Sequence, residues 1–297
     1  MEQEKMAQKK IFSAWKWMLL ILAAVCLFQV KPVKAAGFTR LGLNRTYTAY
    51  DVTGDGKRDR IRIATSGRSG YFSQVRVIIN GRNRLVKKFS YSSPTVVRFR
   101  ICNLSSGKPF LFMECMGDSL VENTACLYQY SGGSLRTVLN LRNMLSKNYF
   151  YKYYFDVKRV SGNTITFLAG GLAYNTGVID FDMSFAYRGG RFVRTSTTTR
   201  LAERNIRWGG SKTNTYTVVK RFQTYQKAGS RVKAFAPAIG ERVKITHICI
   251  RNKVPYFRIV DSRGRAGWMN GINSSYYSRV VKHPRYYCYF REATIVG

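Results

Sequence analysis

Acidic residues are scarce in this chain, which holds 15 Asp and Glu against 50 Lys and Arg in 297 residues and has a formal net charge of +35. A glycosidase site needs two carboxyl groups in different environments, and this composition leaves few candidates. Outside residues 51–59, the pair that we consider is Asp180 and Asp182. Two positions apart on a strand, they face the same side of a sheet. We interpret them as surface polar positions.

Histidine and nucleophile motifs are scarce as well. The chain has two His: His247 stands in an alternating apolar run beside Cys249, and His283 precedes Pro284 in a basic stretch. A Ser or Cys nucleophile requires a base and an orienting group, yet neither G-x-S-x-G nor a papain-like Cys signature is present. The absence of C-x-x-C also makes a zinc site unexpected. We therefore predict a protein without catalytic residues.

The cysteine count excludes a complete internal disulfide framework. Of the six Cys, Cys26 lies in the amino-terminal apolar run, and the other five are an odd number. Two pairings stay open, Cys115 with Cys126 and Cys249 with Cys288. We favour buried free thiols, because Cys packs as a small hydrophobic residue.

Residues 1–36 are typical of a secretory signal peptide. Several Lys precede the apolar run 17–30, which is shorter than the roughly 20 residues that span a bilayer. Val33, Lys34 and Ala35 supply a small-residue cleavage pattern, and an uncleaved membrane anchor is the alternative. Removing residues 1–35 takes away six Lys and two Glu and leaves a net charge of +31. We expect a protein that is secreted or held at the cell surface, as in Gram-positive bacteria.

Three carboxylates are concentrated in residues 51–63, D-V-T-G-D-G-K-R-D-R-I-R-I. Calcium loops supply side chains from positions 1, 3, 5 and 9 and a carbonyl from position 7, with Gly at position 6. In that order, these positions hold Asp51, Thr53, Asp55, Asp59, Lys57 and Gly56. Arg62 stands at position 12, where an EF-hand has Glu, and the alternating residues after Asp59 predict a strand instead of a helix.

This loop resembles the aspartate-rich loops of the FG-GAP and VCBS families, secreted β proteins whose blades carry D-x-[DN]-x-D-G-x-x-D calcium loops before a strand. The resemblance implies a calcium-bound β-blade. The alternative is an Asp/Gly turn that binds no ion, in which the carboxylates accept hydrogen bonds from loop amides. Thr53 and the neighbouring basic residues keep this alternative open.

Residues 38–200 are predicted to form an all-β body. Asn80-Gly81 is a strong hairpin signal, and further hairpins are expected around residues 105–108 and 161–163. Tyr130 and Tyr187 stand 57 positions apart, each before a Gly-Gly turn, which suggests two blade-like repeats. A closed propeller needs about four blades, so we expect an open propeller-blade-like stack or a sandwich. Residues 149–156, Y-F-Y-K-Y-Y-F-D, are predicted as a half-buried strand, the alternative being a sugar- or base-stacking platform.

Residues 201–214 lack an apolar period and are predicted to be a linker to a tail of residues 215–297. The tail contains G-E-R-V-K-I at 240–245, which predicts a turn into an alternating strand. Y-F-R-I-V-D-S-R-G-R-A-G-W-M at 256–269 predicts a strand, a turn at 262–264 and a short strand that ends in Gly-Trp. This pattern resembles the bacterial SH3-like domain, which implies a small barrel that attaches secreted proteins to cell wall or peptide ligands. Tyr256 and Trp268 match the aromatic pair nearest the expected groove, with core packing as the alternative. Residues 276–290 depart from the family pattern.

A strongly positive field attracts anionic polymers without deciding the fold. Outside a cell these are wall phosphate polymers, acidic glycans, lipid headgroups and stray nucleic acid, for which no specific readout motif is present. We predict an exported, non-catalytic, calcium-supported binding protein that adheres to an anionic cell-wall or extracellular surface. The alternative is a cell-wall-modifying hydrolase with a wall-binding tail.

Overall fold

The computed structural model describes residues 35–68, 70–89, 94–117, 124–201, 214–275 and 289–293. The predicted signal peptide, apart from its last two residues, Cys288 and most of the segment 276–290 lie outside these ranges. The described residues confirm the all-β class, with one short 3-10 helix, η1 (Leu141–Met144). Within them, no helix is long and apolar enough to cross a membrane.

Three antiparallel units of four strands follow one another along the chain, each with its strands in sequential order. The first unit contains β2 (Thr46–Tyr50), β3 (Asp59–Arg68), β4 (Tyr71–Ile79) and β5 (Arg82–Lys88). The second contains β6 (Val96–Asn103), β7 (Pro109–Met116), β8 (Thr124–Ser131) and β9 (Ser134–Asn140), and β1 (Gly37–Leu41) joins it beside β6. The third contains β10 (Phe150–Ser161), β11 (Thr164–Ala173), β12 (Gly177–Arg188) and β13 (Arg191–Arg194).

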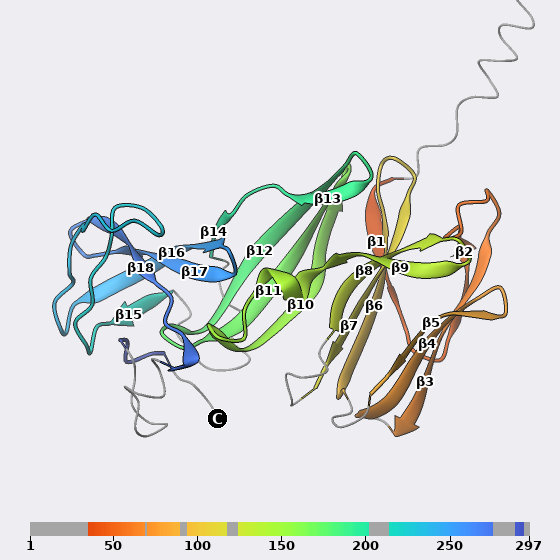
Figure 1. Cartoon of the computed structure of the whole chain (residues 1–297), viewed down its shortest axis with the longest axis horizontal. Helices are drawn as coiled ribbons and strands as arrows, with labels where there is room; N and C mark the ends of the chain where they lie inside the picture. Colours follow the sequence, from red (N-terminus) through yellow and green to blue (C-terminus); the bar gives the residue numbers. More distant parts are fainter. Residues whose placement is uncertain are drawn as a thin grey trace, which may run out of the picture.

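A fourth sheet, here called the tail sheet, contains β14 (Thr198–Arg200), β15 (Thr215–Thr217), β16 (Arg242–Arg251), β17 (Val254–Val260) and β18 (Ala266–Asn270). Figure 1 shows the four sheets in a row along the long axis, with the third unit between the second unit and the tail sheet. Strands β14 and β15 both pair with β16, and β17 and β18 follow in order. The strands that the structure describes in the tail do not close into a barrel.

The last hairpin of each unit turns in the same way. In the first unit Asn80 and Gly81 have φ of 51° and 77°, and the Gly-Gly pairs at 132–133 and 189–190 also have positive φ at both positions. Two-residue turns with positive φ match the twist of the flanking strands, and Asn and Gly tolerate this conformation best. The predicted hairpins are therefore confirmed, and the structure contains three such units where two repeats were expected.

The second unit is apolar on both faces. Ile101, Leu111 and Met113 pack with residues of the first unit in one core. Their neighbours along the strands, Phe110 and Phe112, face the opposite way, into a second core shared with the third unit. A sheet covered on both sides produces continuous apolar runs instead of alternation, which explains the segment F-L-F-M at 110–113.

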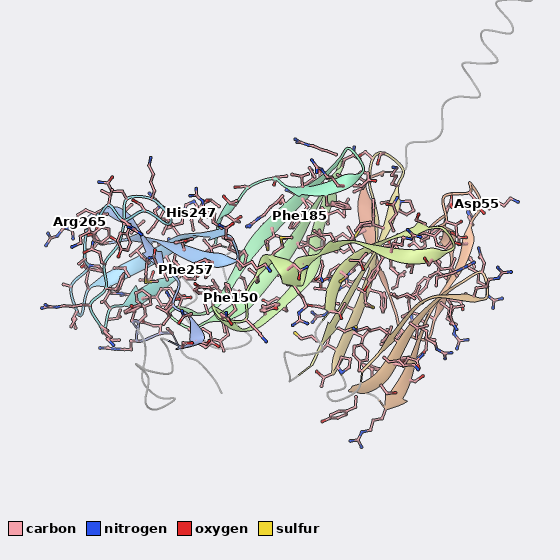
Figure 2. All side chains as sticks on the ribbon, viewed as in Figure 1. Asp55, Phe150, Phe185, His247, Phe257 and Arg265 are labelled. Carbon is pink, nitrogen blue, oxygen red and sulfur yellow. The ribbon has the colours of Figure 1, made fainter. Side chains whose placement is uncertain are left out.

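The third unit and the tail share the second core, which includes Phe150, Phe185 and Phe257 (Figure 2). Polar contacts also join the two, since Arg194 Nη1 donates to the Ile250 carbonyl at 3.2 Å. Strand β14 lies before the predicted linker at 201–214, yet it pairs with β16 of the tail sheet. The chain therefore enters the tail sheet before residue 201, and residues 202–213 lie outside the described ranges.

All four described cysteines, Cys102, Cys115, Cys126 and Cys249, are buried free thiols. Burial raises the pKa of the Cys115 thiol to about 12. Cys115 and Cys126 belong to the core between the first two units, so they pack as small apolar side chains.

A buried polar network lies between the second and third units. Glu114 Oε1 accepts the Phe155 backbone N–H at 2.7 Å, and Oε2 pairs with Arg98 at 2.8 Å. Arg100 pairs with Asp156 at 2.9 Å. Burial raises the pKa of Glu114 to about 7, although the charge of Arg98 opposes the shift. The junction therefore contains a carboxyl group that titrates near neutral pH.

The Glu114→Gln variant tests this group, because the amide oxygen can still accept the Phe155 N–H. A carboxyl with a raised pKa stabilises the fold fully below its unfolded-state pKa of 4.5, and this contribution is lost as the pH rises through about 7. We expect the free energy of unfolding of the wild type, relative to the variant, to fall by on the order of 3 kcal/mol across this window. Denaturant unfolding at a series of pH values measures it. A difference that stays constant with pH would show that Glu114 titrates normally.

Candidate functional site

The aspartate loop, residues 51–59, connects β2 to β3 and is built around the buried side chain of Asp59. Asp59 Oδ2 accepts the backbone N–H groups of Val52 and Thr53 at 2.6 and 2.8 Å. Its Oδ1 accepts the Thr53 hydroxyl at 3.1 Å and the Asn80 side-chain amide at 2.7 Å. The bond from Asn80 joins the aspartate loop to the β4–β5 turn. Asn80 thus has a second role, which its preference for turns does not reveal.

The other two carboxylates of the loop are more exposed and have fewer partners. Asp51 accepts the amides of Gly54 and Gly56 at 2.7 and 2.9 Å, and Asp55 accepts the amide of Lys57 at 2.8 Å. Both glycines have positive φ, 78° and 86°, which turns their N–H groups toward Asp51. The loop thus has the amide-to-carboxylate bonds expected of an Asp/Gly turn.

Calcium binding by this loop stays a prediction. In the parts of the chain that the structure describes, the carboxylates are arranged around amides and do not form a ready cluster of three metal ligands. A carboxylate has about four lone-pair sites, so Asp51 and Asp55 retain acceptor capacity, whereas Asp59 already accepts four bonds. Asp51, Asp55, Thr53 and the Lys57 carbonyl are the groups that would hold the ion.

The residues considered for catalysis have structural contacts instead of a common site. Asp180 accepts the Tyr154 hydroxyl at 2.6 Å, and Asp182 pairs with Lys158 at 2.8 Å on the surface of the third unit. His247 lies on β16 with Nδ1 2.9 Å from the Thr246 hydroxyl. The interpretation of Asp180 and Asp182 as polar positions on one face of a strand agrees with their places on β12, where both side chains are half-buried.

The two aromatic residues predicted for ligand binding lie on one face of the tail sheet. Tyr256 on β17 and Trp268 on β18 are half-buried, and the residues that alternate with them, Phe257 and Met269, are in the core. Tyr256 and Trp268 are not cross-strand partners, because Trp268 pairs with Arg258 and Tyr256 pairs with Asn270. Gly229 of a neighbouring loop lies close to Tyr256: a Cβ atom added to Gly229 would be 3.4 Å from the Tyr256 hydroxyl. Tyr256 is therefore against the loop of residues 218–241, here called the long loop.

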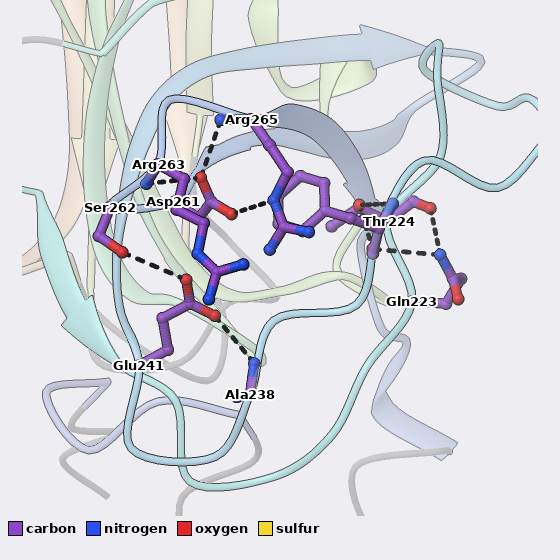
Figure 3. Close-up of polar contacts among 9 residues, drawn as sticks. Gln223, Thr224, Ala238, Glu241, Asp261, Ser262, Arg263 and Arg265 are labelled. Atoms are coloured by element: carbon purple, nitrogen blue, oxygen red, sulfur yellow. Dashed lines mark hydrogen bonds and ion pairs between the residues drawn. The ribbon is translucent and has the colours of Figure 1, made fainter.

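Hydrogen bonds within the long loop, and an ion pair beside it, fix the loop next to β18; Figure 3 labels Thr224, Asp261 and Arg265. The Thr224 N–H donates to the Phe235 carbonyl at 2.9 Å, and the Phe235 N–H donates to the Thr224 hydroxyl at 3.2 Å. Arg265 lies over the Phe235 ring at 4.9 Å from its centre and pairs with buried Asp261 at 2.6 Å. These contacts fix the backbone of residue 225, which bonds to Trp268 in both directions, at 2.9 and 2.7 Å.

Sequence reasoning missed Tyr225 as a neighbour of Trp268. The two residues are far apart in the chain, and the long loop has no strand pattern that would predict their pairing. Sequence reasoning also missed Arg258 as a neighbour of Trp268. Its place in an alternating strand next to the Gly-Trp segment could have indicated that the two side chains share a face.

Every carboxylate of the described residues has a hydrogen-bond or ion-pair partner within the protein. Four of them form the ion pairs Arg98–Glu114, Arg100–Asp156, Lys158–Asp182 and Arg265–Asp261. The others accept N–H or O–H groups: Asp51, Asp55, Asp59, Asp180, Glu241 and Glu292. Few carboxylates are thus available to neutralise the many Lys and Arg side chains at the surface.

Comparison of the chain with protein-family models, with curated proteins and with solved structures found no match.

Two substitutions separate the structural and ion-binding roles of the aspartate loop. If the folded loop binds calcium, the wild-type melting temperature should rise with calcium and fall with a chelator. Asp55→Ala should abolish this shift with little effect on stability in chelator, because the exposed side chain accepts one amide. Asp59→Ala should lower the free energy of unfolding by about 2–4 kcal/mol even in chelator, because it leaves buried donors unpaired.

The measurements are thermal unfolding of both variants in calcium and in chelator, and calorimetric titration of the wild type with calcium. Identical wild-type melting in the two buffers, together with no heat of binding, would show that the loop is a turn without an ion.

Proposed function

We propose that this protein is an exported, non-catalytic binding protein that adheres to an anionic polymer of the cell wall or another extracellular surface. The observation that carries the proposal is the use of the carboxylates. All of those in the described residues are engaged in structural contacts, while the chain has 50 Lys and Arg in total. Positive charge without internal partners is available for an anionic ligand.

The tail is proposed as the wall-attaching module. Its sequence resemblance to the SH3-like domain is supported by the positions of its elements. Gly240 has a positive φ of 85° just before β16, and β17 and β18 flank the turn at 262–264 as the pattern predicts. Trp268 of the Gly-Trp segment has its side chain on the face away from the core, where a ligand can reach it.

The body is proposed as a calcium-supported stack of blades, for which the support is local. The aspartate loop stands between the first two strands of a four-stranded antiparallel unit, the place that the resemblance to FG-GAP and VCBS loops implies. An ion bound there would stabilise the first unit by binding the folded loop only. In Figure 2, Asp55 lies at the opposite end of the molecule from His247 and Arg265 of the tail.

Salt dependence distinguishes adhesion through charge from adhesion through a shaped surface. Exposed charges are screened beyond about 8–10 Å near physiological salt, so attraction by the whole positive field should disappear at high salt. We expect the purified protein to sediment with Gram-positive cell walls at low salt. Most of this binding should be lost when the wall phosphate polymers are stripped or when salt is raised.

Walls with and without phosphate polymers, compared at two salt concentrations, provide the measurement, and an acidic protein of similar size provides the control. Equal binding to stripped and intact walls at low salt would contradict adhesion through anionic polymers.

The hydrolase alternative makes an opposite prediction for the same walls. A wall-modifying enzyme would release soluble fragments, and replacement of Asp180 or Asp182 by Asn would reduce the release. We expect no release above that of a mock preparation, because these side chains bond to Tyr154 and Lys158. Turnover that Asp180→Asn or Asp182→Asn removes would overturn the proposal of a binding protein.

A further inference from the structure

A line of charged and aromatic residues crosses the tail sheet, each the cross-strand partner of the next. The pairings run from β14 through β16 and β17 to β18, with a register shift in β16 between Ile245 and His247, and two isolated bridges continue the line into the long loop. Paired residues of antiparallel strands lie on the same face, about 4.5–5.5 Å apart at Cβ. We call this line the cross-strand row; in order it contains Arg200, His247, Arg258, Trp268, Tyr225 and Lys233.

The cross-strand row lies on the outer face of the sheet. Ile248, Phe257 and Met269, which alternate with its members on the three central strands, are in the core. The end members Arg200 and Lys233 are exposed, and the four between them are half-buried.

The amino half of the cross-strand row places Arg200 and Arg258 on either side of His247. Partial burial and the charges of Arg258 and Arg200 lower the pKa of His247. No carboxylate of the described residues bonds to either arginine; Arg258 instead has Nη1 3.4 Å from the Thr246 hydroxyl. An anion bound beside His247 would be attracted by both guanidinium groups.

The other half combines rings with cations. Trp268 and Tyr225 are neighbours, with Arg258 on one side and Lys233 on the other. Planar guanidinium groups bind phosphate through two parallel hydrogen bonds, and Lys binds it as a point charge. The electron-rich face of an aromatic ring attracts the C–H edges of a sugar or polyol. The order of the side chains therefore fits a ligand in which organic units alternate with phosphates.

We propose that the cross-strand row binds a sugar- or polyol-phosphate chain, with its phosphates at Arg258 and Lys233 and its organic unit on Trp268 and Tyr225. This inference rests on the proposed function, which places the ligand outside the cell. Single-stranded nucleic acid also combines cations with stacked rings, and it is the competing ligand in the test.

Two double variants of equal net charge test the row. Arg258→Gln with Lys233→Gln removes cations on both sides of the rings, whereas Arg221→Gln with Arg263→Gln removes exposed cations of the tail outside the row. The probe is a glycosylated poly(glycerol phosphate), and affinity is measured by calorimetry near physiological salt. We expect the row variant to bind at least about tenfold more weakly, because charged hydrogen bonds are lost, and the control variant to change by about twofold or less.

The His resonances give a local readout of the same interaction. The chain has two His, so His247→Asn identifies the His247 signal by its loss. Glycerol phosphate should shift this signal. Trp268→Leu should weaken polymer binding, and an otherwise unchanged NMR spectrum of this variant would show that the fold is intact.

Each outcome separates the row from the wider proposal. Equal losses in the two double variants would assign binding to the general field and overturn the row, while the proposed function stands. A wild type that binds no polymer at any salt concentration would overturn both. Tighter binding to oligothymidylate of equal charge, with the same dependence on the row, would replace the ligand class by nucleic acid. Binding to phosphatidylglycerol vesicles without binding to soluble polymer would assign the phosphate to a lipid headgroup instead.

Discussion

The packing of the second unit on both of its faces is the constraint on which the rest of the structure depends. Ile101 and Met113 point to the first unit and Phe110 and Phe112 to the third. Neither neighbouring unit could be displaced without exposing one of these apolar surfaces, at about 25 cal/mol per Å². The third unit extends the same core into the tail. Within the described residues, the four sheets are therefore joined to one another by shared apolar cores.

The scarcity of carboxylates acts on this body in a different way. A high net charge destabilises a compact chain through self-repulsion, and the fold places some of its few acids where one carboxylate satisfies several donors. Asp59 accepts four hydrogen bonds in the aspartate loop, and Asp261 accepts two backbone amides as well as Arg265. An acid buried at a turn or junction is then unavailable to surface cations. The positive exterior follows mainly from the excess of 50 bases over 15 acids, and the structural use of the acids adds to it.

The sequence predicts the turns of the fold, because the conformation of a turn depends on a few neighbouring residues. The Asn-Gly and Gly-Gly turns were predictable because few residues other than Asn and Gly adopt positive φ easily. The first unit was not recognised as a repeat, since Asn80 replaces the first Gly and no Tyr precedes the turn in the same frame. Strand β14, T-T-R, has no apolar period, and its pairing partner β16 lies far along the chain. Non-local pairing of this kind leaves no trace in a short sequence window.

The same limit applied to the candidate site. Trp268 was predicted from a sequence resemblance, and the alternation of β17 was visible, but the register that places Arg258 beside Trp268 is fixed by the β17–β18 turn and the core face. Tyr225 and Lys233 join the row only through the long loop, which Thr224, Phe235 and Asp261 hold in place.

The aspartate loop and the cross-strand row lie at opposite ends of the molecule, as the positions of Asp55 and His247 in Figure 2 show. Between them are three packed sheet interfaces. Coupling between distant sites requires an element with two arrangements that both sites bias. An ion at the loop would raise the free energy of unfolding by binding the folded state, whereas affinity at the row is set by the side chains of the tail sheet. Calcium would determine how much folded protein is present, and the row would determine what that protein binds.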